Sequence, residues 1–395
     1  MAAYGQSVAN FIASNPNLLT SDFQLPILAI RESALTHNIN RMAQYCKDKK
    51  ILLAPHSKTS MSPQIAKRQI EAGAWGITVA NFYQANIFLE YGFKKIIIAN
   101  EILEPTVIRE IARLNSEENT KIYFYIDSLP GLRIIQEAID DVASVKLNIL
   151  VEIGTESGRA GVRNLDLLTS LMVEISKEPR ITVHGVSGFE GIVPDSDREA
   201  GAMQVRKFLK EVVAAAKIVQ PFVKNKIIIT AGGSSFFDYV EEEFAEFDGE
   251  SEIILRSGGY VSHDHIHYEN LNPFMNMPSL DQFIPALELW SQVLSIPDPK
   301  LAILNFGKRD AGNDLDNPVP IKKFSMNQAL VSQFKGVINK LNDQHAFMSI
   351  SERTLEIGQK VGLGISHPCT NFDKWRLIPL VDDNYDVKDC IFTQF

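Results

Sequence analysis

The stretch Ile51-Leu52-Leu53-Ala54 runs directly into Pro55-His56-Ser57-Lys58-Thr59. A short aliphatic run followed by polar residues is typical of a buried strand that leaves its sheet. Because side chains alternate along a strand, every second residue from Leu52 through His56 to Lys58 is expected on one face. Lys58 would then be partly desolvated at the carboxyl end of the strand, and desolvation favours the neutral, nucleophilic form of a lysine. A lone lysine is more often an exposed loop residue, so this interpretation depends on the rest of the chain.

Strand-like and helix-like segments alternate after this stretch. Amphipathic patterns predict helices over residues 63–72 and 198–219. Eight strands are expected near residues 51–55, 75–79, 95–99, 121–126, 146–153, 181–189, 226–231 and 252–257. Eight strand–helix units with parallel strands favour an α/β fold, a closed (β/α)8 TIM barrel. A doubly wound open sheet is the alternative, but no G-x-G-x-x-G follows the first strand.

The strand–helix alternation stops after Tyr260. Residues 26–265 are predicted to form the barrel domain, with a further strand at 26–30. Residues 266–395 contain short strand-like pieces between Pro, Asn and Asp, and they predict a second, mostly β domain with one plausible helix over 327–341. Residues 1–25 are expected to pack on that β domain.

The composition excludes several classes of protein. The net charge is −9, and no run of lysine and arginine offsets it, which argues against nucleic-acid binding. The longest apolar runs are far too short to cross a membrane, and the first residues lack a signal-peptide pattern. Three cysteines do not form a disulfide framework. We therefore expect a cytoplasmic protein.

The residues that follow the predicted strands carry the candidate chemistry, because active sites of such barrels lie at the carboxyl ends of the strands. Lys58 follows the first strand. Glycine and small hydroxyl residues fill the loops 231–235 and 256–260 after strands seven and eight. Such loops can close backbone N–H groups around a phosphate, although glycines can also merely turn the chain. Strand eight closes onto strand one, so these loops and Lys58 would be neighbours.

Two arginines are expected at the mouth of the barrel, Arg159 after strand five and Arg256 after strand eight. A buried arginine needs an acceptor. That acceptor is either a carboxylate, with Glu152, Glu190 and Asp127 as candidates, or an oxygen or ring nitrogen of a cofactor.

Two histidine patterns occur near the end of the predicted barrel and beyond it. In His367-Pro368-Cys369, imidazole and thiolate stand two residues apart and can bind one zinc ion. The alternative is a buried cysteine with a hydrogen-bonded histidine. In His263-Asp264-His265-Ile266-His267, three histidines alternate as they would on a strand, and we favour a structural role for them over metal binding.

Together these segments resemble the pyridoxal-phosphate enzymes of the alanine racemase fold (fold type III), and among them the D-serine dehydratase and D-threonine aldolase group. The likeness runs over almost the whole chain. It is carried by residues 55–59, 72–78, 98–101, 159–162, 232–234, 258–260 and 367–369.

The resemblance implies roles for individual residues. Lys58 matches the lysine that holds pyridoxal 5'-phosphate covalently. We expect His56 of the same motif to bind the cofactor as well. Arg159 sits where the fold keeps an arginine near the phenolic oxygen of the cofactor. Arg256 falls where alanine racemases place an arginine against the pyridine nitrogen, whereas the dehydratases more often have a neutral group there. The residues that match the phosphate cradle are Gly233, Ser234, Gly259 and Tyr260.

The resemblance also implies a metal and a reaction. His367 and Cys369 match the ligands of zinc, or of another divalent metal, in the dehydratases, whereas the aldolases tend to have His with Asp. We expect a lyase for D-3-hydroxy amino acids, foremost a D-serine or D-threonine dehydratase that gives a 2-oxo acid and ammonia. The alternatives are a D-threonine aldolase that gives glycine and acetaldehyde, a racemase with a second base, or a non-catalytic pyridoxal-phosphate carrier. Enzymes of this fold are usually homodimers with shared active sites.

Overall fold

The computed structural model describes residues 7–117, 119–142, 145–156, 158–192, 198–277, 281–325, 330–351 and 355–395. The chain divides into two compact units, which are described separately. The barrel unit consists of Met42–Lys58 and Ala66–Gly258. The sheet unit consists of Met1–Arg41, Thr59–Ile65 and Gly259–Phe395. The domain boundaries expected from the sequence stay a prediction.

The barrel unit is built on eight parallel strands, in the spatial order β2-β9-β8-β7-β6-β5-β4-β3. β2 returns to β3 through a bridge between His56 and Thr78, and the N–H of Thr78 donates to the carbonyl of Pro55 at 2.9 Å. The predicted α/β fold with a (β/α)8 barrel is therefore confirmed. The strands are β2 (Leu52–Leu53), β3 (Ile77–Val79), β4 (Lys95–Glu101), β5 (Lys121–Ile126), β6 (Leu147–Glu152), β7 (Ile181–Ser187), β8 (Ile227–Ala231) and β9 (Ser251–Leu255).

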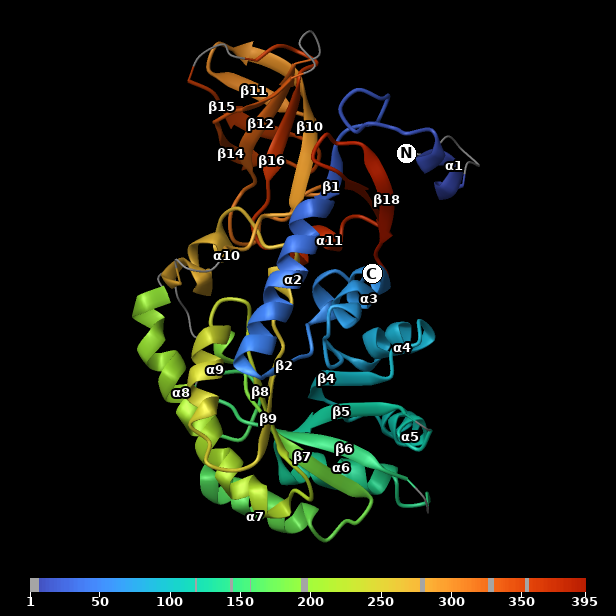
Figure 1. Ribbon diagram of the computed structural model, residues 1–395, viewed down its shortest axis with the longest axis vertical. Helices are drawn as coiled ribbons and strands as arrows, with labels where there is room; N and C mark the ends of the chain where they lie inside the picture. The colour runs from blue at the N-terminus through green and yellow to red at the C-terminus, as the bar shows by residue number, and fades with distance from the viewer. Residues whose placement is uncertain are drawn as a thin grey trace. The chain divides into compact units, whose positions relative to one another are not determined.

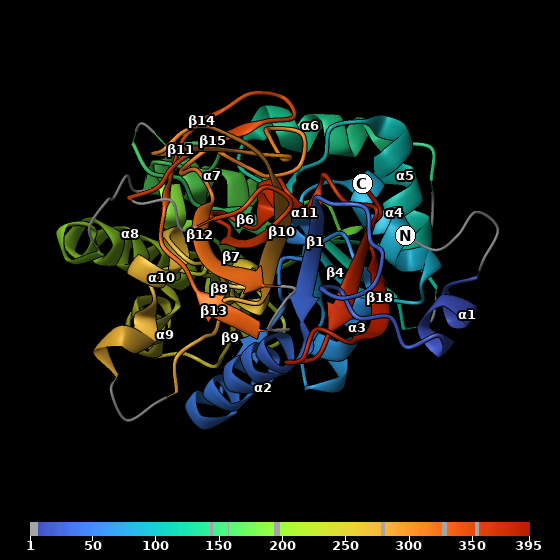
Figure 2. The same ribbon diagram turned by 90° about the horizontal axis from the view of Figure 1, so that it is seen from above.

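Helices run round the outside of the parallel strands, as the view in Figure 2 shows for α4 to α9. Each presents an apolar stripe to the strands; in α5, for example, Ile108, Ile111 and Ala112 are buried. The predicted helix at 198–219 has the bounds expected, and the one at 63–72 ends one residue earlier. The helices are α3 (Pro63–Glu71), α4 (Phe82–Glu90), α5 (Pro105–Leu114), α6 (Leu129–Ala138), α7 (Leu165–Ile175), α8 (Arg198–Val219) and α9 (Phe237–Ala245).

Alternate residues of the strands fill the barrel in layers. An apolar cluster occupies the interior and includes Ala54, Ile97, Leu150, Ile228 and Ile254. Because side chains on one face recur every second residue, the inward positions nearest the carboxyl ends are occupied by polar residues. These are His56, Glu101, Glu152, Thr230 and Arg256. The strands thus place a polar layer on top of an apolar one, at the end where such barrels bind ligands.

The sheet unit contains the predicted mostly β region. Figure 1 shows its strands, whose main path is β13-β12-β16-β10-β1-β17-β18. β11, β15 and β14 extend from β10. The strands are β1 (Ile27–Arg31), β10 (Leu287–Asp298), β11 (Leu301–Leu304), β12 (Val319–Ser325), β13 (Leu330–Gln333), β14 (Val337–Leu341), β15 (Ala346–Ser349), β16 (Lys360–Gly364), β17 (Leu377–Val381) and β18 (Val387–Phe392).

The amino-terminal segment packs on this sheet. β1 pairs antiparallel with β10 and parallel with β17. Phe11 of α1 (Val8–Ala13) and Leu18 join the core around Trp290, whose side chain is fully buried. The remaining helices are α2 (Glu32–Lys49), which crosses from one unit into the other, α10 (His267–Asn270) and α11 (Cys369–Phe372).

The helix expected over residues 327–341 is wrong. Residues 327–329 lie outside the described residues, and β13 and β14 occupy most of the remainder. β13 pairs with β12 and β14 with β15, so tertiary pairing decides this segment over its local pattern. Along the residues that the structure describes, every helix is too short or too polar to traverse a bilayer.

Candidate active site

The lysine segment leaves the barrel through a short turn. β2 ends at Leu53, and residues Ser57–Thr59 form a 3-10 turn. The side chain of Lys58 is exposed, so the expected strand alternation ends at His56 and the expected desolvation of Lys58 is wrong for this structure. Backbone pairing continues past Pro55, because the N–H of His56 still donates to the carbonyl of Arg256 at 3.2 Å, and the chain turns only from Ser57 onward.

His56 lies among three cations. Its Nδ1 is buried and has no hydrogen-bond partner among the residues that the structure describes. Burial lowers the pKa of His56 well below its usual value, and Lys58, Arg256 and Arg159 lower it further. Its imidazole is therefore neutral at physiological pH. The structure brings together four residues that the sequence predicted, His56 and these three cations. The positive charge of the three cations suits a phosphorylated cofactor.

Arg256 is held rigidly inside the barrel. Its side chain is buried, and it donates to Oγ1 of Thr230 at 2.7 Å and to the carbonyl of Gly188 at 2.6 Å. Thr230 in turn donates to the carbonyl of Ile254. These acceptors are neutral oxygens, not one of the candidate carboxylates. Arg159 is exposed, and its guanidinium lies 3.9 Å from Oε1 of Glu152, which is one of the candidate carboxylates.

The glycine turn after β8 already binds a carboxyl group of the protein itself. Gly232 has φ +111°, which favours glycine, and its N–H donates to Oε2 of Glu190 at 3.0 Å. The N–H of Gly233 donates to Oε1 of the same carboxylate at 2.5 Å. Glu190 is fully buried, and burial raises its pKa although these N–H groups act against the shift. The turn therefore directs two N–H groups at carboxyl oxygens, the kind of donor that a phosphate cradle requires, and both are bonded to Glu190 in this structure.

A pair of carboxyl groups at the barrel mouth was not predicted. Glu152 ends β6 and is 4% exposed, and its side chain contacts that of Glu101 at the end of β4. Burial, followed by the contact with Glu101, raises the pKa of Glu152 to about 8. Two carboxylate oxygens can hydrogen-bond only when one carries a proton. The strand alternation that passes through Leu150 to Glu152 is the sequence signal that could have placed this carboxyl group inside the barrel.

Two predicted cradle residues belong to the sheet unit. Gly259 and Tyr260 lie in the 3-10 turn Gly259–Val261. A Cβ atom on Gly259 would lie 2.6 Å from the ring of Tyr268, so a larger residue there would have to displace that ring. Tyr260 is buried, with its ring 5.6 Å from that of Phe283. Ser234, of the barrel unit, is half-buried.

The His-x-Cys motif forms a compact polar cluster within the sheet unit. His367 and Cys369 are in contact, and Cys369 is the main cause that raises the pKa of His367 to about 9. Burial acts against this shift, and Asp314 adds to it. Sγ of Cys369 lies 3.4 Å from Oγ1 of Thr59. The pair offers the nitrogen and sulfur donors that suit zinc.

The neighbouring histidines differ from the strand pattern expected. His263 lies in an irregular segment and contacts Oε2 of Glu269 at 3.0 Å, and His267 begins α10. Within the described ranges, no group of three or more His, Cys, Asp or Glu side chains is arranged to hold a metal ion. Two protein ligands would leave coordination positions open for water or substrate, as catalytic zinc sites do.

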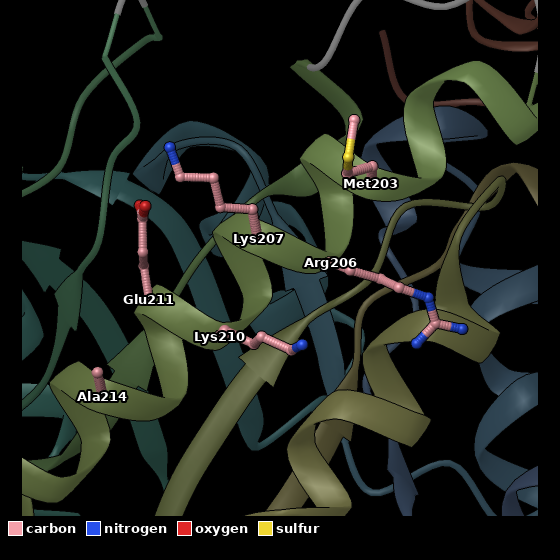
Figure 3. A pocket seen from close by; sticks show the side chains of 6 residues that line it. All are labelled: Met203, Arg206, Lys207, Lys210, Glu211 and Ala214. Atoms are coloured by element: carbon pink, nitrogen blue, oxygen red, sulfur yellow. The ribbon is translucent and has the colours of Figure 1, made fainter.

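A hollow of about 720 Å³ lies along α8 in the barrel unit, lined by Met203, Arg206, Lys207, Lys210, Glu211 and Ala214. Figure 3 shows the end of Lys207 pointing away from the ends of Arg206 and Lys210. Arg206 is also paired with Glu243 at 2.6 Å. This hollow therefore does not gather its charges around one ligand, in contrast to the surroundings of His56.

A parallel eight-stranded barrel with a lysine and a glycine turn at its strand ends, in one chain with a mostly antiparallel sheet, is the arrangement of the fold type III pyridoxal-phosphate enzymes. The family model described as "Alanine racemase, N-terminal domain" matches residues 30–245, which is more than half of the chain. The chain belongs to this family. A second model, described as "Putative serine dehydratase domain", matches residues 286–381.

Individual proteins are similar over most of their length. The chain is 23% identical over 375 residues to a 3-hydroxy-D-aspartate aldolase of Paracoccus denitrificans (strain Pd 1222), covering 94% of this chain and 92% of the relative. It is 24% identical over 316 residues to a D-threonine aldolase of Arthrobacter sp., covering 79% of each. A solved structure of a D-threo-3-hydroxyaspartate dehydratase, a cysteine-to-alanine mutant in the metal-free form, has a TM-score of 0.76 at 19% identity, covering 96% of this chain and 99% of that one.

Proposed function

We propose that this protein is a pyridoxal-phosphate-dependent lyase for small D-3-hydroxy amino acids. The observation that carries the proposal is the convergence of Lys58, Arg159 and Arg256 on the neutral His56 at the carboxyl ends of the barrel strands. The family supports the cofactor. Similar proteins with lyase activity on D-3-hydroxy amino acids support the substrate class.

The residues of the barrel fit the cofactor. Lys58 would hold it covalently, Arg159 and Arg256 would contact its ring, and the loop at Gly233 and Ser234 would lie at its phosphate. The bound cofactor would withdraw electrons from Cα of the amino acid. Lys58, once released by the substrate amine, is the base that would take the Cα proton. The rigid pairing of Arg256 with Thr230 and Gly188 would keep its charge in place throughout.

His367 and Cys369 would hold zinc or another divalent metal. Such an ion polarises an oxygen and makes a hydroxyl a better leaving group. The metal-free form of the similar dehydratase mutant supports a metal site in this group of enzymes. The His-x-Cys motif, and the dehydratase-domain match that contains it, favour dehydration to a 2-oxo acid and ammonia.

Aldol cleavage is the second candidate, and the two aldolases among the similar proteins support it. Both reactions need the same Cα activation and differ in the bond that breaks at Cβ. A homodimer with shared active sites remains a proposal that follows from the family resemblance, and a cytoplasmic location remains a proposal that follows from the composition.

One experiment separates the candidates. The purified protein, loaded with pyridoxal phosphate and zinc, is incubated with D-serine, D-threonine, 3-hydroxy-D-aspartate and their L forms. We expect 2-oxo acid and ammonia from the D forms. Glycine with an aldehyde would show the aldolase instead. If none of the D forms is consumed and only racemisation is detected, the lyase proposal is wrong.

A further inference from the structure

One ring nitrogen of His367 is in hydrogen-bond contact with a carboxylate. Its Nδ1 lies 2.5 Å from Oδ2 of Asp314. The other oxygen of that carboxylate, Oδ1, accepts from Oγ1 of Thr370 at 2.6 Å. Both oxygens of Asp314 are therefore engaged, and the carboxylate can only accept from the imidazole. A His367 that binds a metal through Nε2 would therefore keep its ring proton on Nδ1.

The backbone of His367 is fixed in an unusual conformation. It has φ +48°, which residues with a Cβ atom rarely adopt. Its N–H donates to Oδ2 of Asp264 at 3.2 Å, and its carbonyl accepts from Nδ2 of Asn371 at 3.0 Å. A conformation of this kind persists only when its surroundings over-determine it, and such residues are concentrated at functional sites. The imidazole is therefore held from the backbone as well as from the ring.

Metal-binding histidines commonly donate their second ring nitrogen to a carboxylate, which fixes the tautomer and the ring orientation. We propose that Asp314 is the positioning residue of the metal site: it holds His367 so that Nε2 and the sulfur of Cys369 bind one divalent cation, and Thr370 anchors Asp314. This inference rests on the proposed metal-dependent function. It assigns Asp314 a contact with His367 and none with the metal.

The test measures zinc affinity of the cofactor-loaded protein by competition with a chromophoric chelator. Asp314→Ala should weaken zinc binding about 10- to 100-fold, the usual effect of losing such a partner. Asp314→Asn should weaken it less, because its amide oxygen can still accept from Nδ1. Asp316→Asn is the matched control: it removes the same charge from a carboxylate that accepts from Ser366, and it should leave the affinity within about twofold.

Cys369→Ala separates a failure of this inference from a failure of the proposed function. If Cys369→Ala loses zinc while Asp314→Ala binds it as tightly as the unmodified protein, Asp314 has no positioning role. If Asp314→Ala loses zinc as completely as Cys369→Ala, and the cobalt-loaded protein changes its ligand-field spectrum in Asp314→Asn, Asp314 is a ligand and the inference is overturned. If Cys369→Ala retains its zinc, the proposed metal site itself is wrong.

A second variant keeps the test decisive should Asp314→Ala fail to fold. Thr370→Val removes only the hydroxyl that anchors Asp314 and leaves every charge in place. We expect a weaker loss of zinc affinity in the same direction, with unchanged binding of the cofactor. Unchanged zinc affinity in both Thr370→Val and Asp314→Asn would refute the proposal.

Discussion

Replacing Glu152 by Gln tests the carboxyl pair at the mouth of the barrel. The side chain of Glu152 is 4% exposed, and burial is the main reason why its pKa rises from 4.5 to about 8, with Glu101 second. In the unfolded chain the same group loses its proton near its ordinary pKa. Between these two values the folded protein holds a proton that the unfolded chain has released.

The sign of the effect follows from this difference. The contribution of Glu152 to stability is fully present below about pH 4.5 and is lost as the pH rises through about 8. A tenfold change in proton affinity is worth about 1.4 kcal/mol, so the loss is at most ~5 kcal/mol. Glutamine has the shape of the protonated acid and cannot ionise. Glu152→Gln should therefore be more stable than the unmodified protein at high pH, and the difference should vanish in acid.

The assay is urea unfolding of the cofactor-free protein at about pH 5, 7 and 9, on both sides of the titration. Glu137→Gln is the matched control, since Glu137 lies exposed on α6 and loses the same charge. We expect the advantage of Glu152→Gln to grow from pH 5 to pH 9, while Glu137→Gln follows the unmodified protein. Parallel pH profiles for Glu152→Gln and the unmodified protein would refute the reasoning, because they would mean that Glu152 is already ionised in the fold.

Three further predictions concern the cofactor and the metal. Lys58→Ala should lose the visible absorption of bound pyridoxal phosphate and its covalent fixation by borohydride, whereas persistent labelling would show that another lysine holds the cofactor. Gly232→Ala and Gly73→Ala both place a side chain at positive φ and should each lower stability by roughly 1–2 kcal/mol, but equilibrium dialysis should show weaker cofactor binding only for Gly232→Ala. Cys369→Ala should lose zinc and lyase activity but keep the cofactor absorption, and full activity without bound zinc would reduce the His-x-Cys motif to packing.

The barrel could be predicted from the sequence because its strands carry a local signal. Runs such as Ile96-Ile97-Ile98 and Ile227-Ile228-Ile229 read as strands buried on both faces, and their repetition with helices indicates the closed barrel. The segment at 327–341 carries no comparable signal. Its strands exist because β12 and β15 offer edges to pair with, and that information lies outside the segment.

The candidate site was predictable to the extent that its residues directly follow a strand or form a short motif. His56, Arg159, Arg256 and the pair His367–Cys369 meet that condition. Asp314 does not, because it lies 53 residues from His367 in an irregular segment. The contact between Glu101 and Glu152 joins β4 to β6 across the intervening β5, so each carboxylate alone looks like an ordinary polar residue at a strand end.

The carboxyl group of Glu190 orders the glycine turn before the cofactor binds. The turn at Gly232–Gly233 is bonded to this carboxyl group by two hydrogen bonds before any ligand arrives. Fixing one residue of a flexible loop costs about 1–2 kcal/mol of conformational entropy, and here that cost belongs to folding rather than to binding. The empty protein should accordingly exchange the amide hydrogens of this turn slowly. Cofactor binding should then occur without ordering of this turn. The heat-capacity change of binding should be little more than that expected from burial of the cofactor ring.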